Sequence, residues 1–226
     1  MRVAFARLGE IGAAEWAVLG GILSLRGVAV HCGMDRHVPV ARPRIAFMSV
    51  FTNPASGAAD QAAAYVAAIL DLLGDRAPMS VLRETPSALR RAIEGMLPAD
   101  LRKPEREGKW SVGQVLRHLA DSDLVWGWRL RLILAQDRPP LTGYDQDAWA
   151  ARLHYDEADP FESLQTFDVL RRENLRLIER ASPEDLRRVG VHAERGEETL
   201  EHHRRLYAGH DLLHLAQIER IRRAIR

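Results

Sequence analysis

The sequence predicts an all-α protein: a four-helix bundle with a long crossover loop and an extra helix on its N-terminal side. Apolar residues recur at helical spacing in four main stretches, and capping residues or prolines bound each stretch. No stretch shows the strict alternation of a half-buried strand. The four expected helices span about residues 86–97, 111–135, 160–180 and 200–224, and the extra helix spans 60–73.

Each expected helix begins at a residue that can satisfy free backbone N–H groups or that suits the first turn. These start signals are Asp60, Thr85-Pro86, Ser111 with Gln114, Asp159-Pro160 and Thr199. The spacing of Ser111 and Gln114 is that of a capping box. Gly74 closes the first helix, because glycine readily takes the left-handed conformation found after helix ends.

The segments between the helices are expected to be irregular. Residues 141–159 form the crossover loop, and a loop of that length in a compact domain is often functional. A short turn of helix is expected after Ser182. Residues 187–198 follow no clear period, and a small hairpin around Arg195-Gly196 fits them.

Composition excludes several classes of function. The chain has 226 residues with 32 basic and 31 acidic side chains, so its net charge of +1 favours neither nucleic acid nor an acidic membrane as a partner. The uncharged run from Trp16 to Leu25 is far shorter than a membrane span. The single cysteine, Cys32, allows no intramolecular disulfide, which fits the reducing cytoplasm. We therefore expect a cytoplasmic protein that binds neither nucleic acid nor a membrane.

The first part of the chain differs from the rest. Residues 1–47 show no sustained amphipathic period, and we expect them to be poorly ordered, or an over-extended start with Met48 as the real initiator. Residues 48–79 then form a helical lead-in, and residues 80–226 form the bundle domain.

Three histidines are the candidate metal ligands. His210 and His214 are four residues apart, so on a helix they lie on one face and can bind one divalent metal. The motif is not that of a His-Glu-x-x-His protease, because residue 211 is aspartate. A third ligand must come from elsewhere, and His118 is the best candidate because it faces inward on another expected helix. The alternative is that these imidazoles only pack in the core. Asp121, three residues after His118, is either a carboxylate that orients it or a solvated helix residue.

Three motifs in this order resemble the DinB superfamily, in its YfiT-like branch, over about residues 80–225. They are Trp110-Ser-Val-Gly-Gln-Val-Leu-Arg-His118-Leu-Ala-Asp-Ser-Asp, then Asp145-Gln-Asp-Ala-Trp149, then His210-x-x-x-His214-Leu-Ala-Gln-Ile. The resemblance implies a DinB-like four-helix bundle, often a homodimer, that binds a divalent metal, commonly zinc or nickel, through His118, His210 and His214. Arg117 departs from the pattern, since YfiT-like members often carry a second histidine there.

The resemblance also suggests an activity. Some relatives transfer a low-molecular-weight thiol such as bacillithiol or mycothiol, or isomerise maleylpyruvate with such a thiol. Others have been described only as metal-dependent hydrolases. Three neutral nitrogens leave a metal with open positions, where a thiol or water has a lowered pKa. The bundle mouth near Tyr144, Trp149 and Tyr155 would receive the electrophile.

Three functions therefore remain open from the sequence. The first is transfer of a low-molecular-weight thiol to an electrophilic small molecule. The second is hydrolysis by metal-bound hydroxide. The third is a non-catalytic helical module that binds a metal or ligand, or dimerises. No catalytic residue is assigned: Asp121, Tyr207 and Asp211 are near the histidines in sequence only.

Overall fold

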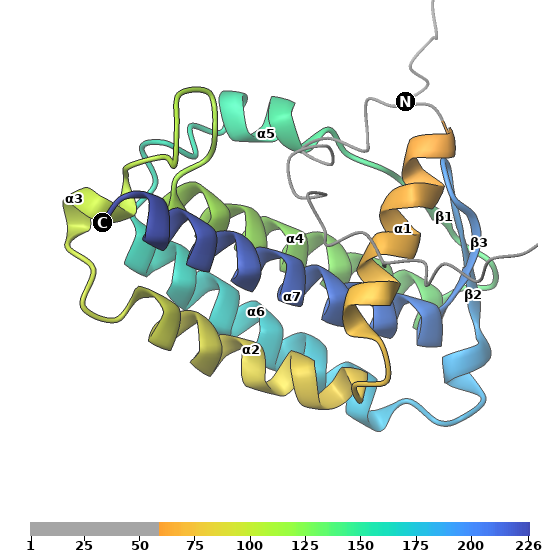
Figure 1. The fold of residues 1–226 in the computed structure, drawn as a ribbon. Coiled ribbons are helices and arrows are strands. Elements are labelled where there is room, and N and C mark those ends of the chain that lie inside the picture. The colour runs from red at the N-terminus through yellow and green to blue at the C-terminus, as the bar shows by residue number, and fades with distance from the viewer. Residues whose placement is uncertain (1–58) are drawn as a thin grey trace, which may run out of the picture. The chain divides into compact units, whose positions relative to one another are not determined.

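The computed structural model of the chain describes residues 59–226, and these residues form a helical bundle with a small sheet at one end (Figure 1). The bundle consists of α2 (Pro78–Ile93), α4 (Val112–Ala135), α6 (Pro160–Arg180) and α7 (Leu200–Ala224). The predicted all-α four-helix bundle is thus confirmed. The expectations for residues 1–47, for Met48 and for the lead-in before residue 59 lie outside the described residues.

Helices α4 and α6 run in the same direction. Near their N-terminal ends, a Cβ atom on Gly113 would lie 3.1 Å from the Cγ atom of Pro160. Further along both helices, Arg171 Nε donates to Asp123 Oδ2 over 3.0 Å. Because both partners advance together, the chain must return along the whole bundle between the two helices. Residues 136–159 make this return, which confirms the crossover loop (Figure 1).

The crossover segment contains more regular structure than the sequence analysis expected. It includes a short strand, β1 (Pro140–Leu141), and a helix, α5 (Gln146–Arg152). The Asp145 side chain caps α5 by accepting from the backbone N–H groups of Asp147 and Ala148, both over 3.0 Å. An aspartate at this position is a common start signal, so the signal was present in the sequence.

The hairpin that the sequence suggested is present. Strands β2 (Val189–His192) and β3 (Gly196–Thr199) pair antiparallel, and Gly196 takes a positive φ of 77° at the turn. Strand β1 pairs parallel to β2. The 3₁₀ turn η3 (Asp185–Arg187) precedes β2, as expected after Ser182. This three-stranded sheet lies where α4 and α6 both end (Figure 1).

Helix α2 begins earlier than the sequence analysis expected. It starts at Pro78, so Thr85-Pro86 lies inside the helix and is not its N-terminus. A proline inside a helix leaves the carbonyl four residues before it without its usual donor. Here Arg171 Nη1 donates to that carbonyl, Leu82 O, over 3.1 Å. A partner on another helix therefore satisfies the group that would otherwise end α2. The predicted loop after α2 also holds a short helix, α3 (Pro98–Leu101).

The extra helix is α1 (Ala59–Leu73), and it packs on α7. Gly209 allows this contact, because a Cβ atom there would lie 2.4 Å from the Ile69 carbonyl oxygen. Gly74 ends α1 with a positive φ of 55°, as predicted. Among residues 59–226, no helix has the length and apolar character needed to cross a membrane.

Candidate metal centre

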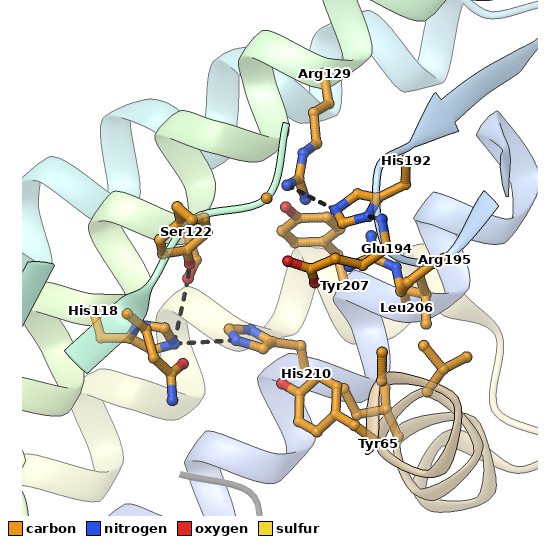
Figure 2. A pocket seen from close by; sticks show the side chains of 16 residues that line it. Tyr65, His118, Ser122, Arg129, His192, Glu194, Arg195, Leu206, Tyr207 and His210 are labelled. Atoms are coloured by element: carbon orange, nitrogen blue, oxygen red, sulfur yellow. Dashed lines mark hydrogen bonds between the residues drawn. The ribbon is translucent and has the colours of Figure 1, made fainter. Parts of the chain in front are cut away.

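The three histidines that the sequence singled out converge between α4 and α7. His118 Nε2 lies 3.2 Å from His210 Nε2, and His214 Nε2 lies 3.1 Å from the same atom. One ligand nitrogen from each ring lies within 4.8 Å of the others. Figure 2 shows His118 and His210 pointing toward each other across the pocket. The fold therefore brings together residues that are 92 positions apart in the sequence.

Local structure on each helix sets these positions. His210 and His214 lie one turn apart on α7, which begins at the predicted cap, where Thr199 accepts from the His202 N–H over 3.0 Å. Helix α4 begins two turns before His118 at the predicted capping box. There the Ser111 backbone N–H donates to Gln114 Oε1 over 2.9 Å, and Ser111 Oγ accepts from the Gln114 N–H.

All three imidazoles are held in the neutral form. Desolvation by burial lowers the pKa values of His118 and His210 well below 6.5, and electrostatic repulsion between a protonated ring and the neighbouring His214 lowers them further. Desolvation also lowers the pKa of His214 to about 4. Because a neutral imidazole has one nitrogen lone pair, each ring can offer that lone pair to a metal.

The nitrogen geometry fits a divalent cation. His214 Nδ1–H donates to Gln217 Oε1 over 2.7 Å, which leaves the His214 Nε2 lone pair facing the other rings. Three Nε2 atoms this close cannot all find donors in one another. In tetrahedral zinc sites, with Zn–N distances of about 2.05 Å, ligand nitrogens lie about 3.3 Å apart. The observed separations of 3.1 and 3.2 Å are close to that value.

Asp121 does not orient His118, the role that the sequence analysis offered as one alternative. Its Oδ2 accepts from the Tyr155 hydroxyl over 2.7 Å, and its Oδ1 pairs with Arg117 over 3.0 Å. The other ring nitrogen of His118, Nδ1, is buried without a hydrogen-bond partner among the described residues. Tyr155 is accordingly a buried residue and not part of the pocket mouth.

Sequence reasoning missed the residues that surround the histidines. Gln217 could have been found, since it lies three residues after His214 and so on the same helical face. Ser122, four residues after His118, likewise lies beside its ring, with Oγ 3.4 Å from Nε2. Ser122 Oγ also lies 3.0 Å from the Tyr144 hydroxyl, a contact across the crossover segment that no local pattern reveals.

A pocket of about 110 Å³ opens beside His118 and His210 (Figure 2). Its walls come from α1, α4, α7, the crossover segment and the hairpin, and the polar or aromatic side chains among them are Tyr65, Ser122, Arg129, Tyr144, Gln146, His192, Glu194, Arg195 and Tyr207. Tyr144 thus lies where expected, and its ring contacts that of Trp149 with centroids 4.5 Å apart. Burial raises the pKa of Tyr144 to about 12, so its hydroxyl stays protonated at neutral pH.

A buried polar network lies behind the histidines. The Arg171 guanidinium contacts both Asp123 and Asp211, and Asp211 Oδ2 accepts from the Thr85 hydroxyl over 2.7 Å. Desolvation and the second carboxylate raise the pKa of Asp123 to about 7. Asp211 follows His210 directly, so this network holds the part of α7 that carries His210 and His214. Asp211 faces away from the pocket and is no general base.

Comparisons with known proteins agree with this architecture. A profile of the DinB superfamily matches residues 82–218. The chain belongs to the DinB superfamily, in its YfiT-like branch. It is 34% identical over 146 residues to YfiT of Bacillus subtilis, a protein whose name describes it as a candidate metal-dependent hydrolase. The match covers 64% of this chain and 82% of that protein. It is 32% identical over 138 residues to OB0782 of Oceanobacillus iheyensis, similarly named, covering 61% and 79%.

A solved DinB structure is similar in three dimensions. The structure of YfiT from Bacillus subtilis superimposes with a TM-score of 0.61 at 33% identity, covering 65% of this chain and 84% of that one. That protein is described as having an unusual four-helix bundle topology. In this chain, the parallel α4 and α6 with their long return segment depart from a simple up-and-down bundle.

Proposed function

We propose that this protein is a metal-dependent enzyme that transfers a low-molecular-weight thiol to an electrophilic small molecule. His118, His210 and His214 would hold the divalent metal, and the pocket beside them would receive the electrophile. When bound, such a cation supplies a Lewis acid that lowers the pKa of a thiol or water at its open position. The observation that carries the proposal is the convergence of three neutral imidazole nitrogens beside a pocket.

The lack of a side-chain base beside the histidines favours a thiol over water as the nucleophile. A thiol that coordinates a metal is deprotonated outright, whereas hydrolysis usually also needs a side-chain base. Among the described residues that line the pocket, Glu194 is the one carboxylate, and it lies on the hairpin side against Gly143. Tyr144 keeps its proton and can donate but not accept one. No described side chain next to the histidines is thus a ready general base.

The reaction balances without a further reagent. The thiol proton passes to solvent, and the sulfur forms a bond to the electrophilic carbon. The leaving group of that carbon departs with the bonding electron pair. Ser122 and Tyr144, joined by a 3.0 Å hydrogen bond, would donate to a polar group of the electrophile near His118.

The second candidate is metal-dependent hydrolysis, which the names of the similar DinB proteins favour. It uses the same histidines and differs in the nucleophile. Turnover that needs an added thiol supports transfer, and turnover in buffer alone supports hydrolysis. A protein that binds metal but turns over no substrate with or without thiol would instead be a binding module.

The first test is metal content, measured by elemental mass spectrometry on tag-free protein. We expect about one zinc or nickel ion per chain, and its loss in His210→Ala. The matched control is His154→Asn, because His154 is exposed and its positive φ of 52° suits asparagine. Equal metal content in His210→Ala and His154→Asn would exclude the three-histidine site.

The assembly is also open to test. We propose a cytoplasmic homodimer, and exposed apolar side chains on adjacent helices support the dimer. Trp128 and Leu124 on α4 are 63% and 53% exposed, and Val169 on α6 is 50% exposed. Light scattering on the eluting protein should give twice the mass of one chain, and a mass of one chain would exclude the dimer.

A further inference from the structure

Arg129 is a buried charge without a counter-ion at the end of the pocket that is far from the histidines. It is 5% exposed and lines the pocket. Its Nη2 donates to the Thr142 carbonyl over 2.6 Å, and its Nε has no hydrogen-bond partner among the described residues. None of the carboxylates in the described part of the chain forms an ion pair with it. Burying an arginine in this way is costly unless an anion neutralises it.

The neighbouring Arg195 does not share this property. Its Nε and Nη2 donate to the two carboxylate oxygens of Glu198 over 2.5 and 2.8 Å. Its charge is therefore matched within the hairpin. Arg129 is the guanidinium whose pairing the fold leaves incomplete.

His192 presents a second unmatched donor at the same place. Its Nδ1 accepts from the Glu194 backbone N–H over 3.2 Å, and its Nε2 lies 3.3 Å from Arg129 Nη2. Both neighbours can only donate, whereas a neutral imidazole has a single acceptor nitrogen. The backbone amide is fixed by the hairpin, so Nδ1 is the acceptor and Nε2 carries the proton. The N–H groups of His192 and Arg129 then face each other (Figure 2).

An oxyanion bound by these two groups would neutralise the Arg129 charge and would accept a hydrogen bond from the His192 N–H. One oxygen accepts from His192 Nε2–H and another from the Arg129 guanidinium, whose planar fork suits carboxylate and phosphate. The Tyr207 hydroxyl, stacked beside Trp126, borders the same space. We propose that Arg129 and His192 form an anion subsite for a carboxylate or phosphate of the small-molecule ligand.

The position of this subsite defines the ligand further. Arg129 and His118 lie on the same side of α4, three turns apart, which is about 16 Å along the helix axis. Both line one pocket, with the histidines at one end and Arg129 near the hairpin. The ligand is thus an elongated molecule that carries its anionic group several bonds from the group facing the histidines. Only this last step rests on the proposed function.

Calorimetric titration of the full chain, made metal-free with chelator, tests the subsite directly. The probes are succinate for a carboxylate and inorganic phosphate for a phosphate group, and the tighter probe identifies the class. We expect Arg129→Gln to weaken binding of that probe about 10-fold or more, since charge-assisted hydrogen bonds are lost. Arg131→Gln, an exposed arginine on the same helix, should bind within about 2-fold of wild type.

Several outcomes overturn the subsite. Equal binding by Arg129→Gln and wild type would do so, as would no binding of either probe to wild type at 10-fold above ordinary metabolite concentrations, about 10 mM. If Arg129→Gln does not fold, ¹⁵N spectra of wild-type histidine side chains decide. They should show protonated Nε2 at His192, with a shift of that resonance on adding the probe. Protonated Nδ1, or no shift, excludes the subsite.

The design separates this inference from the metal chemistry. His210→Ala should lose metal yet bind the probe with an affinity within about 3-fold of that of wild type, because Arg129 and His192 are not among the three histidines of the candidate metal centre. If the metal-content test finds no metal in the wild-type protein but probe binding still depends on Arg129, the subsite stands and the proposed function is excluded. Metal-dependent turnover without Arg129-dependent probe binding would do the reverse.

Discussion

Gln217 sets the protonation of His214 from a position three residues away. Its Oε1 accepts from His214 Nδ1 over 2.7 Å, so the lone pair lies on the nitrogen that faces His118 and His210. Residues that orient a metal-bound histidine in this way typically contribute a factor of about 10 to 100 in metal affinity.

Gln217→Leu is therefore expected to weaken zinc binding by about 10-fold or more while the helix content stays the same. Leucine keeps the side-chain size but cannot accept a hydrogen bond. Competition with a chromophoric chelator measures the affinity, and circular dichroism measures the helix. Gln165→Leu, on the exposed face of α6, is the control. Equal zinc affinity in the two variants would mean that Gln217 does not orient the ligand.

His192 gives a pH dependence whose sign can be worked out. Desolvation, then Arg195 and Arg129, lower its pKa from 6.5 to about 3. Between these values the unfolded chain binds a proton that the folded chain does not. The free energy of unfolding therefore decreases as the pH falls below about 6.5, by up to about 1.4 kcal/mol per pH unit from this histidine.

His192→Gln removes this pH-dependent loss of stability. In chelator, the variant should be less stable than wild type at pH 7, and the difference should shrink by about 2 kcal/mol by pH 5. Denaturant unfolding at several pH values measures it, and His154→Asn should track wild type throughout. A stability difference that stays constant from pH 7 to 5 would show that His192 is not held neutral by the fold.

At the scale of elements, α1 forms one wall of the pocket and packs on α7, most closely documented where Ile69 approaches Gly209. Tyr65, Val66 and Ile69 of α1 line the pocket. A Cβ atom on Gly209 would lie 2.3 Å from Ile69 Cγ2 and 2.4 Å from its carbonyl oxygen. The backbone contact cannot be relieved by a side-chain rotation, so any larger residue must push α1 away.

Gly209→Ala should therefore destabilise the protein by about 1–3 kcal/mol and loosen α1. Thermal unfolding measures the first effect, and faster proteolysis within residues 59–73 measures the second. Zinc content should not change, because α1 contributes no histidine to the candidate metal centre. Ala216→Leu adds bulk on the exposed face of the same helix and should leave both readouts unchanged. Undiminished protease resistance in Gly209→Ala would refute the close approach.

The helices were largely predictable because the residues that begin and end them lie next to their boundaries in the sequence. Ser111, Asp159 and Thr199 cap the helices that the sequence assigned to them. Helix α2 was misjudged because Thr85-Pro86 has the form of a helix start. Its interior position depends on Arg171, which reaches Leu82 O from α6 and is 89 residues away. No local pattern contains that contact.

The candidate site was predictable only in part, for a related reason. The spacing of His210 and His214 indicates a pair on one helix face, and the inward position of His118 on another expected helix made it the best third candidate, which the resemblance to the DinB superfamily supported. The donor pair of Arg129 and His192 depends on the hairpin lying against α4, 63 residues apart in sequence. Such pairings follow from topology, so the sequence alone did not indicate them.

At the scale of the whole molecule, Arg171 joins the four bundle helices. It projects from α6 to Asp123 on α4, to Asp211 on α7 and to the Leu82 carbonyl on α2. Its guanidinium also lies 4.6 Å from the Phe167 ring centroid. One positive charge between two carboxylates leaves a net negative charge in the core, which agrees with the raised pKa of Asp123.

Arg171→Met should destabilise the protein by about 3–5 kcal/mol, because it leaves two buried carboxylates without their counter-ion. The triple variant Arg171→Met, Asp123→Asn, Asp211→Asn removes the charges together and should be more stable than Arg171→Met alone. Denaturant unfolding at pH 7.5 measures both. If the cost came from lost packing, the two asparagine substitutions would add further destabilisation. Recovery in the triple variant would instead show that the network joins the helices through charge balance, which also keeps α7 and its two histidines in register with α4.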